Sequence, residues 1–368
     1  MTWREWAAAE GREIRSAHRW REPRDFDAAG PEGKLAPDGR PVVSYASNDY
    51  LGLTQHPDVV AAAHAALDRW GTGSGSARLI VGSRPVHAEL EAALASWKGT
   101  DRAVVFPTGF ATNLGVLTTF GAPGVVVCSD ELNHASIIDG SRLSRARVEV
   151  YRHADVDHLR HLLEAAPAGE RHVVVTDTVF SMDGDLAPVD SLAELCARHS
   201  ALLVLDEAHA VLGPDPDLAG RDVLRVGTLS KTLGALGGFV AGPAPLTELV
   251  VNRARSYVFT TAPTPADTAA ALAAVGVVRS SEGEALRARL HDHVERLRSG
   301  HPSPIVPVVL GDEARTLAAA ATLLEQGMLV PAIRPPTVAP GTSRLRVALS
   351  AAHTSAQIDA LRTALADL

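Results

Sequence analysis

The sequence is poor in cysteine and aromatic residues and contains no long apolar run. Cys128 and Cys196 are the only cysteines in 368 residues, which is too few for a disulfide framework. No apolar run approaches the roughly 18 residues that a membrane helix needs. The net charge is −8 and no basic stripe stands out. We therefore expect neither nucleic acid nor a membrane as a partner.

The N-terminal 25 residues also lack the apolar core of a secretory signal, because charges occur throughout them. Their Arg and Ala content slightly resembles a transit peptide, but Glu5, Glu10 and Glu13 argue against one. We expect an amphipathic N-terminal helix and a cytoplasmic protein. The chain as a whole has 46% hydrophobic and 21% charged residues, an ordinary globular composition with enough length to bury a core.

Between residues 56 and 245, short apolar runs alternate with Ala/Leu-rich helical patterns such as 157–166 and 191–199. Nearly continuous apolar runs are typical of strands buried on both faces of a parallel sheet. The alternation predicts the α/β class, with a mostly parallel sheet flanked by helices on both faces. The expected strands are 103–107, 124–130, 172–177, 201–207 and 223–227.

The pattern changes after residue 260 to long helices and a few short strands. This change predicts three parts: an N-terminal arm at 1–45, a large domain at 46–260 and a smaller α+β domain at 261–368. The elements expected in the last part are helices at 268–298, 313–327 and 355–367, and strands at 304–310 and 343–350.

Several polar residues follow the expected strands, at the sheet edge where α/β proteins bind their ligands. Asp206 ends one strand and His209 comes three residues later; Lys231 follows the next strand, and His134 follows another. Taken singly, these residues could be a helix cap, a surface lysine and structural histidines. Gly109 opens a helix after residues 103–107, where amide N–H groups can approach an anion.

Together these residues make up the set that pyridoxal phosphate requires. The cofactor's aldehyde bonds to a lysine, and its ring nitrogen pairs with a carboxylate. Its phosphate suits a helix N-terminus and hydroxyl groups. We therefore expect Lys231 to carry the cofactor and Thr228 to reach its phosphate, while the glycines of 227–238 let the chain pass close by. The glycine run at 71–83 is a poor dinucleotide fingerprint, because no clear strand precedes it and no acidic residue closes a βαβ unit.

Nine motifs in order, over about residues 41–355, carry a resemblance. They are SNDYLGL (47–53), GSGSARLIVG (73–82), HAELE (87–91), TGFATN (108–113), DELNHAS (130–136), TDTVFSMDGDLAP (176–188), LDEAH (205–209), GTLSKTLGALGG (227–238) and IRPPTVAPGTSRLRVALSAAH (333–353). With these motifs the chain resembles the α-oxoamine synthases, a family of fold type I pyridoxal-phosphate enzymes.

The resemblance implies a decarboxylative condensation of an amino acid with an acyl thioester. Segment 333–353 is most similar to members that join L-alanine to a pimeloyl group for biotin synthesis, with coenzyme A or a carrier protein as the acyl donor. Other acyl-CoA condensations, with glycine or serine as donor, remain open, as do an aminotransferase and an inactive cofactor-binding regulator. The regulator is disfavoured because the chain retains the lysine, the aspartate and both histidines of the set described above, and segment 334–338 argues against an aminotransferase.

The resemblance also assigns roles by position. Catalysis falls to Lys231, His134, Asp206 and His209. The cofactor residues are Lys231, Asp206 at the ring nitrogen, His209 at the phenolic oxygen, His134 on the ring face, Ser181, Thr228, and the backbone of Gly109 and Phe110. The substrate residues are Arg19, Asn48, His134, Thr337 and Arg346, with Arg346 and Asn48 at the amino-acid carboxylate and Thr337 in the acyl channel. No metal is expected.

The family also implies a homodimer with its active sites at the interface. Residues 74–76 and 259–261 are the segments that we expect one subunit to contribute to the other. Two departures from the family pattern stand out. Ala210 replaces the glycine that usually follows the histidine, where alanine tolerates positive φ poorly. Thr108 replaces a common serine and keeps its hydroxyl.

Overall fold

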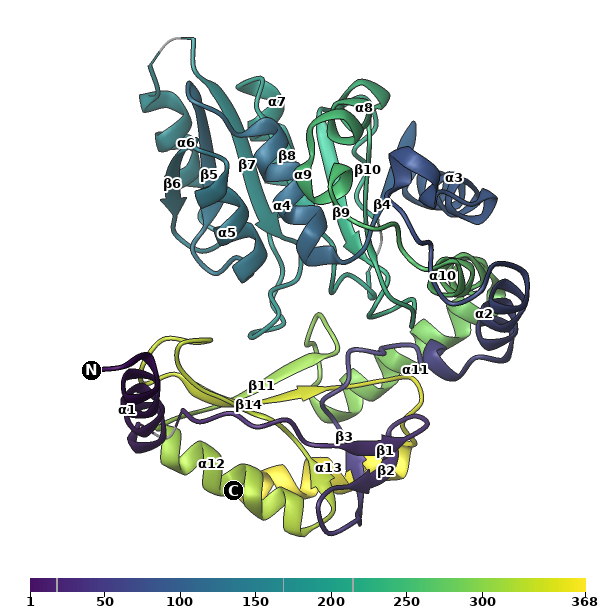
Figure 1. The fold of residues 1–368 in the computed structure, drawn as a ribbon. Coiled ribbons are helices and arrows are strands. Elements are labelled where there is room, and N and C mark those ends of the chain that lie inside the picture. The colour runs from purple at the N-terminus through teal and green to yellow at the C-terminus, as the bar shows by residue number, and fades with distance from the viewer. Residues whose placement is uncertain (18, 168, 214) are drawn as a thin grey trace. The chain divides into compact units, whose positions relative to one another are not determined.

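The computed structural model describes residues 1–17, 19–167, 169–213 and 215–368 (Figure 1). The chain forms two compact units. The larger unit is Asp49–Arg289, and the smaller unit combines Met1–Asn48 with Leu290–Leu368. No helix in the described ranges is long and apolar enough to cross a membrane.

The larger unit is built on a seven-stranded sheet with the order β4-β10-β9-β8-β7-β5-β6. Strand β10 runs antiparallel to both of its neighbours, and the strands from β9 to β6 pair in parallel. The bounds are β4 Arg102–Phe106, β5 Val125–Asp130, β6 Arg147–Tyr151, β7 Arg171–Asp177, β8 Leu202–Asp206, β9 Val223–Thr228 and β10 Gly238–Gly242.

Helices cover both faces of this sheet (Figure 1). On one face, Val173 and Val175 of β7 belong to a core with helices α4, α5, α8 and α9. On the other face, Val174 of the same strand packs with helices α6 and α7. The alternation follows from the two-residue repeat of a strand. The bounds are α4 Gly109–Phe120, α5 Ala135–Leu143, α6 Val156–Ala165, α7 Val189–Arg198, α8 Ala244–Arg253 and α9 Arg255–Val258.

A second group of helices completes the larger unit. Helix α10 packs against α2 and α3, and Ala66, Val86 and Ala269 form a small core among them. The bounds are η1 Leu53–Gln55, α2 Pro57–Trp70, the π-helical turn η2 Arg78–Gly82, α3 Pro85–Lys98 and α10 Pro265–Val278. Helix α11, Ser281–Leu297, begins in the larger unit and ends in the smaller one.

The smaller unit contains two sheets. Strands β1, β2 and β3 form an antiparallel meander, and β12 pairs with β3 in parallel. The other sheet has the order β11-β14-β13 and is antiparallel. The bounds are α1 Trp3–Ser16, β1 Phe26–Ala28, β2 Glu32–Leu35, β3 Arg40–Ser44, β11 Ile305–Gly311, α12 Glu313–Glu325, β12 Met328–Leu329, β13 Ala332–Ile333, β14 Ser343–Ala348 and α13 Ser355–Ala366.

The predicted α/β class is confirmed, and the five predicted strands of the large sheet end within one residue of the observed bounds. The expected N-terminal helix is present as α1, and none of its residues is buried. The expected helix at 268–298 is two helices, α10 and α11, because the chain turns at Arg279 and Ser280. The boundaries between the two units differ from the predicted ones at 45/46 and 260/261. Helix α10 belongs to the larger unit because it packs on α2. Residues 1–48 belong to the same unit as the C-terminal strands.

Candidate active site at the carboxyl ends of the strands

A cavity of about 190 Å³ lies in the larger unit, at the carboxyl ends of β8 and β9. The end of β7 and the first turns of α4 and α5 also contribute to its wall. This is the position at which an open α/β sheet binds its ligand. The predicted cofactor residues that line it are Gly109, Phe110, His134, Asp206, His209, Thr228 and Lys231. Among the residues that the structure describes, Ser181 is not part of this wall, and its role stays a prediction.

Lys231 lies in the loop between β9 and β10, which folds back on itself through backbone hydrogen bonds. Gly234 of this loop has φ +62°, and a Cβ atom there would come within 2.6 Å of the backbone nitrogen of Thr54. A residue with a side chain would therefore strain the backbone and collide with the 53–54 segment. Only a glycine fits at this position of the lysine loop.

A chain of hydrogen bonds joins Lys231, His209 and Tyr50. The Nζ atom of Lys231 lies 2.8 Å from Nε2 of His209, and Nδ1 of His209 lies 2.6 Å from the Tyr50 hydroxyl oxygen. Tyr50 is fully buried, and His209 is 4% exposed. Since an ammonium group can only donate, Nε2 of the imidazole accepts from it and Nδ1–H donates to Tyr50. Lys231 thus sets the tautomer of the histidine, and Tyr50 holds the orientation of its ring.

Asp206 ends β8 and is buried, at 5% exposure. Its Oδ2 atom accepts a 2.7 Å hydrogen bond from the Asn113 side-chain amide, and Oδ1 accepts one from the Ala208 amide at 2.9 Å. The Asn113 amide nitrogen also lies 2.9 Å from the Ser136 hydroxyl. The buried Oδ1 of Asn113 has no hydrogen-bond partner among the residues that the structure describes. A carboxylate held in this way has a fixed direction.

His134 caps the N-terminus of α5, where Nδ1 accepts a hydrogen bond from the Ser136 amide. Burial lowers the pKa of His134, although the nearby Asp206 opposes the change. Nδ1 acts as an acceptor, so the neutral ring carries its proton on Nε2. The backbone N–H of His134 donates to Asp177 at 2.8 Å, and both burial and the charge of Asp206 raise the pKa of Asp177.

The N-terminus of α4 forms a seat for an anion. Thr108 caps this helix by accepting from the Ala111 amide at 3.0 Å. The amides of Gly109 and Phe110 are the first two of the helix and have no intrahelical acceptor. The hydroxyls of Thr228 and Ser230 lie 2.8 Å from each other on the same cavity wall. Amides at a helix N-terminus together with hydroxyl groups are suited to bind a phosphate.

Gly238 on β10 permits this seat to form. A Cβ atom at Gly238 would lie 2.5 Å from the Gly109 nitrogen and from the Thr112 hydroxyl. The strand therefore passes directly against the first turn of α4, and only a glycine fits there.

The cavity residues fit pyridoxal phosphate. Lys231 can bond to an aldehyde, Asp206 can pair with a protonated ring nitrogen, and the start of α4 can bind a phosphate. The unsatisfied Oδ1 atom of Asn113 offers a further acceptor at the same wall. No cluster of metal-ligating residues occurs in the described ranges.

The predicted substrate residues Asn48 and Arg346 lie together in the smaller unit. Arg346 on β14 is 5% exposed, and its guanidinium lies 3.2 Å from the Asn48 side-chain oxygen. Arg19 instead pairs with Glu313 at 3.3 Å, and the residue whose guanidinium lies 3.2 Å from the Thr337 hydroxyl is Arg21. The substrate-binding roles of these four residues and of His134 stay predictions.

Several side chains of the site could not be selected from the sequence. Asn113 and Asp177 line the cavity, and Tyr50 contacts His209 behind it. All three lie within motifs quoted above, but no motif indicates which of its members reach the site. Ser136 and Ser230 also line the cavity, and small hydroxyl residues carry too weak a pattern to be selected by sequence alone.

Comparison with known proteins gives consistent results. The family model for class I and II aminotransferases matches residues 40–365. A protein named 8-amino-7-oxononanoate synthase from Anaeromyxobacter dehalogenans is 51% identical over 356 residues, which cover 92% of this chain and 89% of that protein. Another of that name, from Methylobacterium sp., is 46% identical over 93% of this chain and 94% of its own.

Solved structures with the same fold include a serine palmitoyltransferase from S. paucimobilis with a bound PLP–myriocin aldimine. It is 31% identical and has a TM-score of 0.91 over 98% of this chain and 95% of its own. The 8-amino-7-oxononanoate synthase of Francisella tularensis is 26% identical and has a TM-score of 0.73, over 89% of this chain and 97% of its own.

Proposed function

The chain belongs to the family of class I and II aminotransferases, and we propose that it acts in biotin biosynthesis. The reaction is the condensation of L-alanine with pimeloyl-CoA or a pimeloyl carrier protein, which yields 8-amino-7-oxononanoate, the free thiol and CO2. The similarity to curated enzymes of that name, at 44–51% identity over about nine-tenths of the chain, carries this assignment. The cavity that holds Lys231, His209 and Asp206 supplies the matching chemistry.

Bound pyridoxal phosphate supplies an electron sink for negative charge that develops at the α-carbon of the amino acid. Lys231 would hold the cofactor, and its amine, when free, would remove and return the proton at that carbon. Asp206 would pair with the protonated ring nitrogen, and Asn113 and the Ala208 amide hold its carboxylate in place. His209 accepts from Lys231 and restrains the position of its amine.

His134 is suited to donate from Nε2, because its Nδ1 is occupied by the cap of α5. We assign it the ring face of the cofactor and a hydrogen bond to the acyl carbonyl. In the smaller unit, Arg346 would bind the amino-acid carboxylate, since a guanidinium pairs with a carboxylate in a fixed orientation. Asn48, 3.2 Å from that guanidinium, would hold it in place.

A condensation with serine or glycine as donor is the second candidate. The structural match to serine palmitoyltransferase, with a TM-score of 0.91, is closer than the match to the Francisella tularensis synthase, with 0.73. Thiol release separates the candidates: purified, cofactor-loaded protein is given L-alanine with pimeloyl-CoA, L-serine with palmitoyl-CoA, or glycine with acetyl-CoA. Release that requires alanine and the long diacid thioester supports the first candidate.

We also propose a homodimer. The turn η2 exposes Leu79, Ile80 and Val81 at 49%, 74% and 71%, and Phe259 is 71% exposed. Adjacent large apolar side chains in water mark a surface that a partner covers. Sedimentation of the wild type and of an Ile80→Asp variant tests this: we expect a dimer for the first and a shift to monomer for the second. Docking of a carrier protein and a cytoplasmic location stay predictions.

A further inference from the structure

Four charged side chains form a cluster beside the turn that carries Asp206 and His209. We refer to Lys98, Glu207, Asp215 and Arg225 as the four-charge cluster. Lys98 Nζ lies 2.8 Å from one carboxylate oxygen of Glu207, and Arg225 Nε lies 2.6 Å from the other. Arg225 also contacts Asp215 at 2.7 Å, and Lys98 lies 3.5 Å from Asp215.

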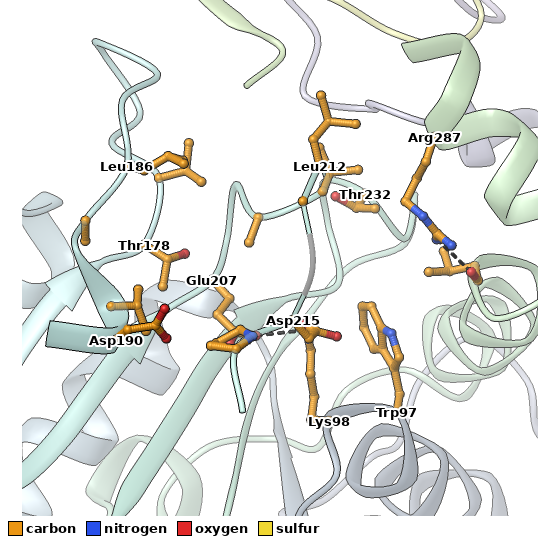
Figure 2. A pocket seen from close by; sticks show the side chains of 18 of the residues that line it. Trp97, Lys98, Thr178, Leu186, Asp190, Glu207, Leu212, Asp215, Thr232 and Arg287 are labelled. Atoms are coloured by element: carbon orange, nitrogen blue, oxygen red, sulfur yellow. Dashed lines mark hydrogen bonds and ion pairs between the residues drawn. The ribbon is translucent and has the colours of Figure 1, made fainter. Parts of the chain in front are cut away.

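The cluster is mostly removed from water. The side chains of Lys98, Glu207 and Arg225 are 4%, 4% and 5% exposed, whereas Asp215 is 52% exposed. Figure 2 shows Lys98, Glu207 and Asp215 at the wall of a cavity of about 770 Å³. Among the described residues, none lines both this cavity and the smaller cofactor cavity, although segments 206–211 and 228–232 contribute residues to each. The cluster is therefore exposed to solvent at Asp215 and buried at Glu207.

The charges of the cluster balance, with two cations and two anions. Burial opposes the charge on Arg225, but Glu207 and Asp215 raise its pKa, so Arg225 stays charged. Breaking a buried ion pair by removing one partner leaves an uncompensated charge in a low dielectric. The remaining groups would then move to regain water or a new partner.

Glu207 connects this cluster to the catalytic turn. Asp206 is the last residue of β8 and Glu207 directly follows it, so the alternation of an extended chain directs their side chains to opposite faces of the sheet. Accordingly Asp206 bonds to Asn113 on α4, while Glu207 bonds to Lys98 at the end of α3 and to Arg225 on β9. The backbone of Glu207 is also held, since its N–H donates to Val226 at 2.7 Å and its C=O accepts from Ala210 at 3.0 Å.

We propose that Glu207 is a positioning residue, anchored by Lys98 and Arg225, that fixes the turn from Asp206 to His209. Asp206 and His209 line the cofactor cavity, whereas Glu207, which lies between them in the same turn, lines the larger cavity. A shift of about 1 Å in catalytic groups can cost roughly 100-fold in rate. The proposal rests on the proposed function only in taking pyridoxal phosphate as the group that this turn contacts.

The test compares charge-removing variants with charge-keeping ones. Glu207→Gln and Arg225→Met each break the cluster, Arg225→Lys keeps the charge, and Leu163→Ala, on the remote helix α6, is a control for lost stability. The pH midpoint of the bound cofactor's absorbance is measured for each, together with kcat and KM. The absorbance is measured without substrate. It therefore still reports the position of the catalytic turn if the substrates that cause thiol release in the wild type contradict the proposed function.

For Glu207→Gln and Arg225→Met, we expect the absorbance midpoint to move by about 0.5 pH unit or more. We expect kcat to fall ~10–100-fold with KM for the amino acid nearly unchanged, since misplaced catalytic groups lower the chemical step rather than binding. Arg225→Lys and Leu163→Ala should keep the wild-type midpoint.

Wild-type midpoints in both charge-removing variants, with a loss of kcat no larger than in Leu163→Ala, would overturn the proposal and leave the cluster a purely structural feature. If Glu207→Gln does not fold, the absorbance midpoints of Arg225→Met and Asp215→Asn test the proposal in its place. Asp215→Asn alters the exposed end of the cluster. The Asp215→Asn variant should shift the midpoint in part, and an unchanged midpoint in both of these variants would also overturn the proposal.

Discussion

Nε2 of His209 lies 2.8 Å from Nζ of Lys231, and Nδ1 of the same ring lies 2.6 Å from the hydroxyl of Tyr50. The histidine thus links a fully buried tyrosine to the amine that is proposed to do the chemistry. This arrangement holds the lysine amine toward the carboxyl ends of the strands, where Asp206 also lies.

Replacement of the lysine tests the role assigned to it. Lys231→Ala should reduce turnover by ~10²–10⁴-fold or more, because it removes both the covalent attachment and the acid–base group. The side chain lies at the cavity wall rather than in the core, so the unfolding midpoint should change little. Thiol release, cofactor absorbance and thermal unfolding measure the three effects. Normal turnover by this variant would refute the assignment.

Removal of the tyrosine hydroxyl tests the orientation of the histidine. Tyr50→Phe leaves Nδ1–H of His209 without its acceptor in a buried site, which costs about 1–3 kcal/mol of unfolding free energy. The ring is then less restrained, and we expect kcat to fall ~10-fold. Kinetics and urea denaturation of the variant provide the measurements. A stability loss without any change in kcat would show that Tyr50 only packs the core.

The close approach of β10 to α4 gives a prediction about cofactor affinity. In Gly238→Ala the new Cβ would lie 2.5 Å from the Gly109 nitrogen, so the start of α4 must shift. We expect the affinity for pyridoxal phosphate to fall by about 10-fold or more, because the amides of the anion seat move. Fluorescence titration of the apoenzyme measures the affinity.

Gly276→Ala on α10 is the matched control, because a Cβ there meets nothing within 4 Å. It should keep the cofactor affinity and raise stability by ~0.5–1 kcal/mol, since alanine loses less backbone entropy in a helix. Equal affinities in the two alanine variants would contradict the account of the anion seat.

Buried histidines predict how stability depends on pH. His87 is fully buried, its Nδ1 accepts from the Arg84 amide at 2.9 Å, and burial lowers its pKa from 6.5. The unfolded chain therefore binds a proton at His87 that the folded chain does not, so the stability that this neutral histidine contributes is complete above pH 6.5 and is lost as pH falls below it. His134 and His353 shift in the same direction and add to the effect.

Urea denaturation between pH 5 and 8 checks this dependence. In His87→Gln the slope of unfolding free energy against pH below 6.5 should decrease by up to about 1.4 kcal/mol per pH unit, the value for one proton. An unchanged slope would mean that His87 titrates normally in the fold.

The sequence predicted those parts of the site that follow directly from strand order. Asp206, His209 and Lys231 come after two neighbouring buried strands, and parallel strands bring such residues to one edge. The contacts of Tyr50 and Asn113 could not be predicted in this way. Each depends on a distant segment meeting the sheet, 159 residues away for Tyr50 and His209 and 93 for Asn113 and Asp206.

The fold shows the same limit. Strand β10 was not predicted, because it is a short run that begins and ends with glycine directly after the lysine loop. It also pairs antiparallel with both neighbours, whereas the apolar runs predicted parallel strands. The break between α10 and α11 also escaped detection, since Arg279 and Ser280 are compatible with a helix. Tertiary packing against α2, rather than local propensity, decides where α10 belongs.

The most direct test of the account is thiol release by purified, cofactor-loaded protein. L-alanine with pimeloyl-CoA is set against glycine with acetyl-CoA and L-serine with palmitoyl-CoA. We predict release that requires both alanine and the diacid thioester. Release only with glycine or serine would keep the family and the roles of Lys231, Asp206 and His209 but would contradict the assignment to biotin synthesis.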